Sequence, residues 1–140
     1  RGICCLVPGI PSKTDNITVT SIVGRFLEHS RIYCFGDGPL RRLYIASADI
    51  MTRNQTRRVE IACPVESREL CEWFSSYLDL LLSDNVKARR MLPDGSYIPL
   101  PAGGEPVDAQ GYYLRNPVEL SATAAPRQSV LQRIRRRIGR

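Results

Sequence analysis

Residues 67–83 read Ser-Arg-Glu-Leu-Cys-Glu-Trp-Phe-Ser-Ser-Tyr-Leu-Asp-Leu-Leu-Leu-Ser and carry the strongest helix signal in this 140-residue chain. Apolar side chains recur there at steps of three and four, which places them on one face of a helix. Ser67 is a suitable N-cap, and Glu69 and Glu72 follow in the first turn, where acidic side chains are favourable. We therefore expect a helix over 67–83 with one buried face, formed by Leu70, Trp73, Phe74, Tyr77, Leu78 and Leu81.

Short apolar runs lie on both sides of this helix. Residues 3–7 are continuously apolar, the pattern of a strand buried on both faces, and residues 17–23 are rich in β-branched side chains. The other strand-like runs are 31–35, 43–47 and 59–65, and residues 89–100 contain the turn Pro93-Asp94-Gly95. Buried strands that alternate with loops and a long helix predict an α/β domain with a mostly parallel sheet flanked by helices.

The net charge of +6 is located at one end of the chain. Residues 121–140 contain six arginines and no acidic residue, which leaves 14 basic and 14 acidic residues in 1–120. The body of the chain is therefore neutral, and its composition does not predict a basic nucleic-acid-binding face. We expect residues 121–140 to form a disordered basic tail after a Pro/Gly-rich loop at 101–110.

The five cysteines indicate a reducing compartment. Their number is odd, most lie in apolar runs, and none has the spacing of a zinc site. Free cysteines often behave as small buried hydrophobic residues in intracellular proteins. No apolar run is long enough to cross a bilayer. We therefore expect a cytoplasmic protein, and because the chain begins with Arg1 inside a strand-like run, we expect it to be part of a longer one.

Polar residues suited to phosphate chemistry cluster where the expected strands meet loops, which is where open α/β sheets place ligands. Arginine can grip two phosphate oxygens, histidine can transfer a proton or a phosphoryl group, and acidic residues can orient both. The candidates of this kind are Arg1, His29, Arg31, Ser47, Asp49, Arg58 and Glu60.

Each candidate also has a simpler interpretation. A lone histidine among charged residues is usually a surface residue, Asp49 could cap a turn, and the pair Arg57-Arg58 could be a solvated strand end. Three functions stay open at this point: an enzyme half-site, a phospholipase D-like phosphodiesterase, or a non-catalytic module that binds polyphosphate or RNA. The last would use Arg1, Arg25, Arg31, Arg57 and Arg58.

The joint pattern resembles a known family. The strings Arg1-Gly-Ile-Cys-Cys-Leu, Pro8-Gly-Ile-Pro and Ser21-Ile-Val-Gly-Arg-Phe-Leu-Glu-His-Ser-Arg-Ile-Tyr are similar to the second C-terminal domain of polyphosphate kinases of the first type. The similarity continues through Tyr44-Ile-Ala-Ser-Ala-Asp, Arg57-Arg-Val-Glu, Asp84-Asn-Val-Lys-Ala and Pro93-Asp-Gly-Ser-Tyr. It covers residues 1–98, and the string that contains His29 is the most specific part.

The resemblance implies a phospholipase D-like half-domain over 1–100, a loop-rich extension over 101–120 and the basic tail over 121–140. It implies reversible transfer of the terminal phosphate of ATP to polyphosphate, through a phosphohistidine in an upstream domain of the same protein. His29 would be the second histidine of that site, Arg1 and Arg58 would bind nucleotide phosphates together with His29, and Arg31, Asp49 and Glu60 would support them.

The resemblance also indicates the partners. It implies ATP, ADP and inorganic polyphosphate as substrates, Mg²⁺ bound by residues outside this chain, and a homo-oligomer of the full-length protein. In the tail, Val130, Leu131, Ile134 and Ile138 would form one apolar stripe on a basic helix. Such a helix suits a polyanion such as polyphosphate, or the anionic surface of the inner membrane.

Overall fold

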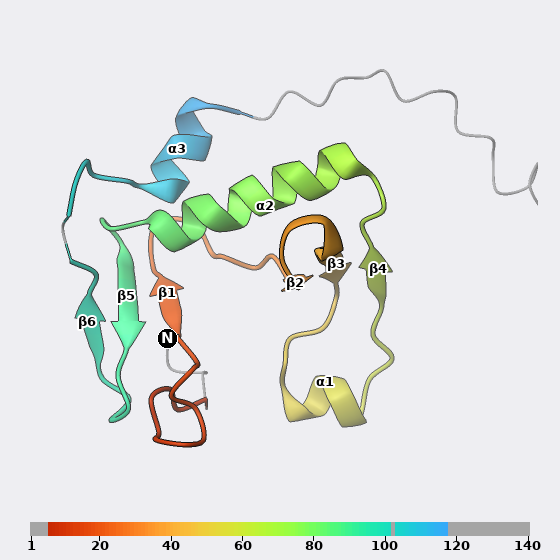
Figure 1. The fold of residues 1–140 in the computed structure, drawn as a ribbon, viewed down its shortest axis with the longest axis horizontal. Helices are drawn as coiled ribbons and strands as arrows, with labels where there is room; N and C mark the ends of the chain where they lie inside the picture. The colour runs from red at the N-terminus through yellow and green to blue at the C-terminus, as the bar shows by residue number, and fades with distance from the viewer. Residues whose placement is uncertain (1–5, 102, 118–140) are drawn as a thin grey trace, which may run out of the picture.

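The computed structural model describes residues 6–101 and 103–117 as two small sheets spanned by one long helix (Figure 1). The first sheet has the strand order β1 (Thr20–Ile22), β5 (Ala88–Met91) and β6 (Tyr97–Pro99). The second has the order β2 (Ile32–Phe35), β3 (Arg42–Ala46) and β4 (Ala62–Pro64). The fold is therefore mixed α/β, as expected.

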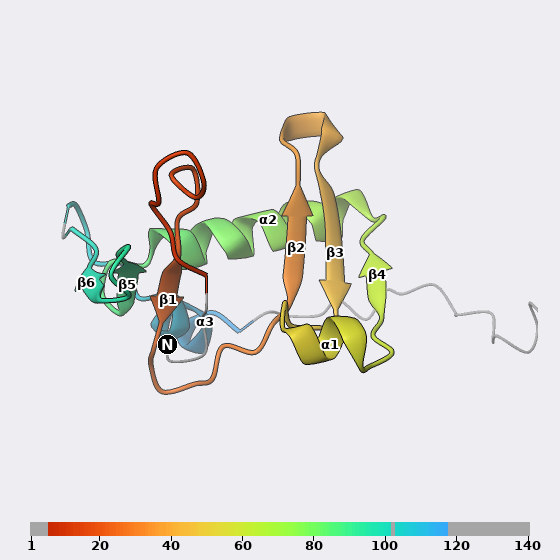
Figure 2. The same ribbon diagram turned by 90° about the horizontal axis from the view of Figure 1, so that it is seen from below.

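All four strand pairings in the described part of the chain are antiparallel, so the prediction of a mostly parallel sheet is wrong there. For two of the pairings, β2 with β3 and β5 with β6, the reason lies in the connections, because parallel neighbours need a long crossover whereas antiparallel ones need only a tight turn. Strands β2 and β3 are joined by a short turn that contains the 3₁₀ helix η1 (Gly38–Leu40), seen side-on in Figure 2. Strands β5 and β6 are joined at Pro93-Asp94-Gly95, the turn that the sequence predicted.

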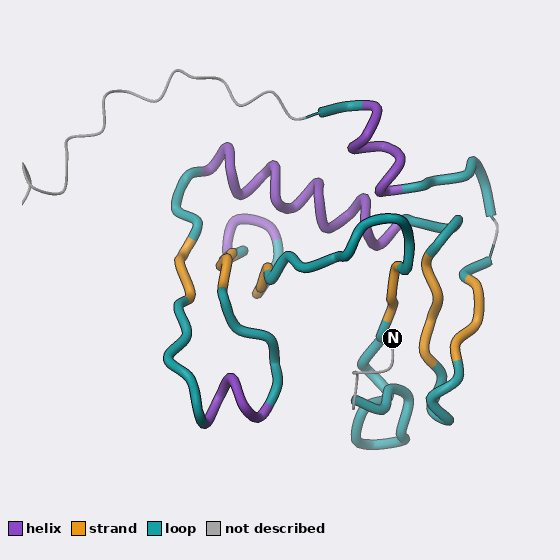
Figure 3. Tube along the Cα trace, turned by 180° about the vertical axis from the view of Figure 1, so that it is seen from behind, coloured by secondary structure: helices purple, strands orange, loops and turns teal. Residues whose placement is uncertain are grey.

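Helix α2 (Arg68–Ser83) confirms the strongest sequence prediction. The Ser67 hydroxyl accepts a hydrogen bond from the Leu70 backbone N–H at 3.4 Å, as expected for an N-cap. The helix lies over one end of the first sheet (Figures 1 and 3) and crosses the face of the second sheet, behind β2 and β3 in Figure 2. Its apolar face is only partly covered, because no residue of α2 is buried and the side chains of Leu70 and Trp73 are 51% and 37% exposed. The predicted apolar face is therefore half-buried along Phe74, Tyr77, Leu78 and Leu81 and exposed at its N-terminal end.

Two short helices were not predicted. Helix α1 (Thr52–Thr56) follows β3, and α3 (Ala109–Arg115) packs beside the C-terminal part of α2 (Figure 1).

The predicted strands have the right positions but are longer than the observed ones, since β1 and β4 have only three residues each. The strand predicted over 3–7 lies mostly outside the described residues, and Leu6 and Val7 are exposed and belong to no strand. The thiols of Cys34 and Cys63 are exposed rather than buried.

The best-buried region centres on a carboxylate. Asp84, which ends α2, has no exposed surface. Its Oδ1 accepts hydrogen bonds from the backbone N–H groups of Val86, Lys87 and Ala88 at 2.7–3.1 Å. Its Oδ2 accepts one from Ala109 at 2.9 Å, at the start of α3. These four bonds compensate the burial of the charge and join α2, β5 and α3.

The basic tail, and with it the predicted amphipathic helix, lies outside the described residues. Within the part that the structure describes, no helix is long and apolar enough to cross a membrane.

Candidate active site

The edge of the second sheet collects the candidate residues. Antiparallel pairing places the start of β2, the end of β3 and the start of β4 side by side, with Ile32 opposite Ile45 and Ala46 opposite Ala62. The segments that leave this edge carry His29 and Arg31 before β2, Ser47 and Asp49 after β3, and Arg58 and Glu60 before β4. Residues from three separate segments therefore meet in one place.

Arg31 holds two of the candidates. Its Nε donates to Asp49 Oδ1 at 2.6 Å and one terminal nitrogen donates to Asp49 Oδ2 at 3.2 Å, a two-point ion pair. The same terminal nitrogen lies 2.6 Å from His29 Nε2. The hydrogen bond from Arg31 lowers the pKa of Asp49 below its ordinary range, and the charges of Arg31 and Arg53 act in the same direction. Asp49 is therefore the ionised partner that fixes the guanidinium.

The contact with Arg31 determines the role of each imidazole nitrogen. A guanidinium has only donors, so His29 Nε2 must accept the hydrogen bond in this arrangement. Nδ1 then carries the hydrogen of the neutral ring and is the nitrogen that can donate to a ligand. The His29 side chain is exposed, so a ligand can reach it.

Ser47 and Glu60 form a second pair beside the first. The Ser47 hydroxyl donates to Glu60 Oε2 at 2.5 Å and accepts from the Ile61 N–H at 3.1 Å. The hydrogen bond with Asp49 raises the pKa of Arg31, and the charge of Glu60 adds to this effect. Glu60 therefore supports Arg31 electrostatically. The strand expected over 59–65 begins only at Ala62, so Glu60 lies in the segment before β4 and not in the strand.

Arg58 stands apart from these pairs. Its side chain is exposed and, among the described residues, it forms no hydrogen bond or ion pair. An unpaired guanidinium can bind an incoming anion without first losing a partner. Arg1 lies outside the described residues, so the structure places six of the seven candidates. Five of them belong to the two hydrogen-bonded groups: His29, Arg31 and Asp49 in one, Ser47 and Glu60 in the other.

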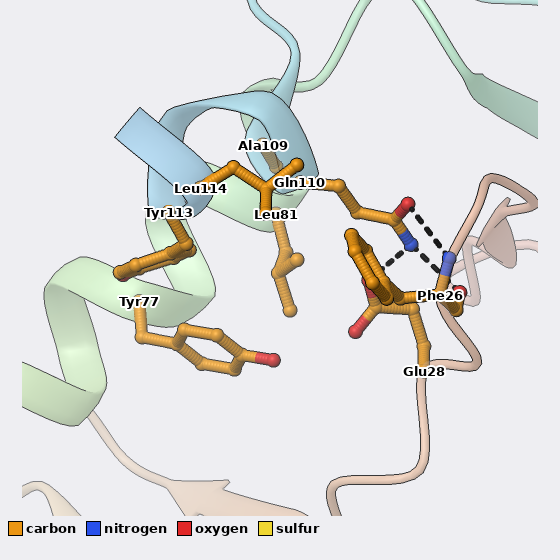
Figure 4. Close-up of a pocket in the computed structure, with 8 residues that line it drawn as sticks. All are labelled: Phe26, Glu28, Tyr77, Leu81, Ala109, Gln110, Tyr113 and Leu114. Atoms are coloured by element: carbon orange, nitrogen blue, oxygen red, sulfur yellow. Dashed lines mark hydrogen bonds between the residues drawn. The ribbon is translucent and has the colours of Figure 1, made fainter. Parts of the chain in front are cut away.

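Other residues that order this edge were missed by the sequence analysis. The Tyr33 hydroxyl donates to the Ala48 carbonyl at 2.8 Å and holds the segment between Ser47 and Asp49. Gln110 of α3 contacts the segment that carries His29 (Figure 4). A glutamine next to a Pro/Gly-rich loop has no distinctive local signal, so only its long-range contacts reveal it.

A cavity of about 290 Å³ lies beneath that segment, between α2 and α3 (Figure 4). Its walls are mainly apolar and aromatic, and the polar side chains of Glu28 and Gln110 lie at one side. The lining residues are Phe26, Glu28, Tyr77, Leu81, Ala109, Gln110, Tyr113 and Leu114. No group of three or more His, Cys, Asp or Glu side chains in the described ranges is arranged to hold a metal ion.

Comparison with known proteins shows which proteins have a similar sequence. The family model for polyphosphate kinase C-terminal domain 2 matches residues 1–110, twelve residues beyond the recognised resemblance. The chain is 47% identical to a polyphosphate kinase of Staphylococcus haemolyticus over 119 residues, 85% of this chain and 16% of that protein. It is 50% identical to one of Prosthecochloris aestuarii over 115 residues, 82% of this chain and 16% of that protein.

A solved structure agrees with the sequence comparisons. The crystal structure of polyphosphate kinase from Porphyromonas gingivalis superposes with a TM-score of 0.76 at 42% identity. The match covers 82% of this chain and 18% of that protein. This chain therefore corresponds to less than a fifth of the length of the relatives that it matches.

Proposed function

Because this chain belongs to the polyphosphate kinase family, as its C-terminal domain 2, we propose that it supplies one half of the active site of a longer polyphosphate kinase. The proposed reaction transfers the terminal phosphoryl group of ATP to the end of a polyphosphate chain. A histidine elsewhere in the longer protein attacks the γ-phosphorus, so that a P–N bond forms, the P–O bond to ADP breaks and ADP leaves. A terminal polyphosphate oxygen then attacks the phosphohistidine, forming a P–O bond and breaking the P–N bond.

The observation that supports this proposal best is the arrangement of His29, Arg31 and Asp49. Phosphoryl transfer depends mainly on positioned positive charge and hydrogen-bond donors. A residue can therefore contribute to it without being the nucleophile. Arg31 is held by Asp49 and in turn holds His29 Nε2, which leaves Nδ1–H for a phosphate oxygen. We propose that this group stabilises the charge that develops on the leaving oxygen, and that Arg58 and Arg1 bind the nucleotide phosphates.

The remaining parts of the proposal concern the longer protein. The two histidines would face each other from two similar phospholipase D-like halves, of which this chain is the second. Mg²⁺ would neutralise phosphate charge when bound, through residues outside the described part of this chain. We also propose that the protein works in the cytoplasm as a homo-oligomer, and that the tail holds polyphosphate or an anionic membrane surface.

The test is His29→Ala in a full-length polyphosphate kinase that contains this chain. We expect polyphosphate synthesis to fall about 10²–10⁴-fold, the usual effect of losing a proton donor in the transition state. Leu27→Ala is the matched control, because Leu27 lies in the same segment with its side chain 84% exposed. A folded His29→Ala enzyme that loses less than about tenfold in rate, or roughly 1.4 kcal/mol, contradicts the catalytic role. If such an enzyme still binds polyphosphate, the chain is a polyanion-binding module instead.

A further inference from the structure

The segment between β1 and β2 carries His29 but has no regular secondary structure. Its side chains are largely exposed, including Phe26 at 45% and Leu27 at 84%. Such a segment is free to move unless specific contacts hold it, and a catalytic group must be held within a fraction of an ångström of its working position. The contacts that hold this segment are therefore relevant to the position of His29.

Gln110 of α3 makes three hydrogen bonds to this segment, shown as dashed lines in Figure 4. Its Nε2 donates to the Phe26 carbonyl at 2.9 Å and to Glu28 Oε1 at 2.8 Å. Its Oε1 accepts from the Phe26 N–H at 3.3 Å. The amide thus pairs with both backbone groups of Phe26, as a neighbouring strand would. It also binds the side chain of Glu28, the residue before His29.

The packing around Gln110 allows this contact only with a small residue opposite. The Gln110 side chain is buried, with 7% of the residue exposed. A Cβ atom on Gly24 would lie 2.3 Å from Gln110 Oε1, so a side chain at position 24 would force the Gln110 amide to move. Glycine at position 24 therefore lets the segment approach the amide closely enough to bond.

Gln110 is itself rigidly anchored. The backbone N–H of Ala109, the preceding residue, donates to the buried Asp84 carboxylate at 2.9 Å. Lys87 Nζ binds both oxygens of Asp108 at 2.8 and 3.0 Å. Asn85 Oδ1 accepts from the Val107 N–H at 2.8 Å. The string Asp84-Asn-Val-Lys therefore holds the start of α3, and α3 holds the segment that carries His29.

We propose that Gln110 is a positioning residue for His29: it fixes the segment so that the imidazole meets Arg31 in the orientation needed for phosphoryl transfer. This inference rests on the proposed function of His29. Among the described residues no hydrogen bond joins Gln110 to His29, so Gln110 acts on His29 through the backbone of Phe26 and the side chain of Glu28.

The test uses Gln110→Leu in the full-length kinase. Leucine keeps the bulk of the side chain and removes all three hydrogen bonds. We expect kcat to fall about tenfold to a hundredfold, as small misplacements of a catalytic group do, with KM for ATP changed less than twofold. Asn116→Ala is the control, because Asn116 caps the C-terminal end of the same helix and, among the described residues, its side-chain amide bonds only to the Tyr112 carbonyl. It should retain full activity.

A second comparison separates positioning from general damage. In the double variant His29→Ala/Gln110→Leu, the rate should equal that of His29→Ala alone, because Gln110 has nothing left to position. A further loss in the double variant, or a single variant that raises KM without lowering kcat, overturns the inference. If Gln110→Leu does not fold, Gly24→Ala disrupts the same contact between the Gln110 amide and the His29 segment. The same criteria then apply to that variant.

The outcomes distinguish this inference from the function on which it rests. An unchanged rate for His29→Ala rejects the proposed function. A large loss for His29→Ala together with less than twofold loss for a folded Gln110→Leu enzyme leaves the function intact and rejects only the positioning role.

Discussion

At Arg31, one guanidinium connects an ionised carboxylate to an exposed imidazole. Arg31 is already committed to Asp49 and His29. Arg58 is exposed and, in the described ranges, unpaired, so it is the arginine available to a ligand. We therefore propose different roles for the two arginines: Arg31 orders the site, and Arg58 binds the substrate.

Replacing Arg58 by lysine tests that distinction. Lysine retains the charge but cannot present two parallel donors to a phosphate group. We expect kcat/KM for ATP to fall roughly tenfold to a hundredfold, which corresponds to the loss of one charge-assisted hydrogen bond of about 1.5–3 kcal/mol. Arg1→Lys should behave alike. Arg68→Lys is the control, since the Arg68 side chain is 92% exposed on α2 and paired only with Glu72. Unchanged ATP kinetics for Arg58→Lys would assign Arg58 to the solvated surface.

We expect the attachment of helix α3 to the segment before β5 to depend on pH, through Asp108. Asp108 caps it by accepting from the Gly111 N–H at 3.0 Å, and it also binds Lys87. The hydrogen bond from Lys87 lowers the pKa of Asp108, with smaller contributions from the Gly111 N–H and the charge of Arg115. A carboxyl whose pKa is lowered on folding stabilises the native state above its unfolded pKa of about 3.9. That stabilisation is lost as the pH falls through the native pKa.

Asp108→Asn isolates the charge, because asparagine is also a good helix cap. At pH 7 we expect the variant to be less stable to urea by on the order of 0.5–1 kcal/mol, the usual range for a partly exposed ion pair. The difference should shrink as the pH falls below about 4, where the wild-type carboxyl becomes protonated. Asp79→Asn, an exposed position on α2, is the control. A gap that stays constant from pH 7 to pH 2 would show that the charge of Asp108 contributes nothing.

The whole molecule has a small core for its size. The buried apolar side chains in the described ranges are few, namely Pro8, Leu43, Ala88, Met91 and Ala109, and the aromatic residues of α2 are partly exposed. The two sheets are linked mainly through α2 and the polar network around Asp84 (Figure 1). The candidate site is likewise an open edge with one histidine, which suits half of a shared site.

An isolated 140-residue chain should therefore not become phosphorylated. Incubated with ATP labelled in its terminal phosphate, it should acquire no acid-labile, base-stable label, because the proposed nucleophilic histidine belongs to another part of the longer protein. The full-length enzyme, treated in parallel, should be labelled. Label on His29 in the isolated chain would make it the nucleophile and overturn its assignment as the second histidine.

The sequence by itself determined the features that depend on neighbours along the chain. Residues 67–83 repeat their apolar side chains at helical spacing after a capping serine, and Pro93-Asp94-Gly95 favours a tight turn, so both were predicted correctly. The grouping of His29, Arg31 and Asp49 was predicted because each follows or precedes a recognisable strand. Local preferences and short-range periodicity are sufficient for these features.

Only the tertiary structure decided how strands pair and what holds the His29 segment. An apolar run does not reveal whether its neighbour will be parallel or antiparallel, because that depends on which segment meets it in space. The Gln110 amide bonds to Phe26, 84 positions away, and the Asp84 carboxylate reaches Ala109 across 25 positions. Such bonds leave no local pattern, since each residue alone is an ordinary polar side chain. Burial and geometry give them their roles, and both exist only after the chain has folded.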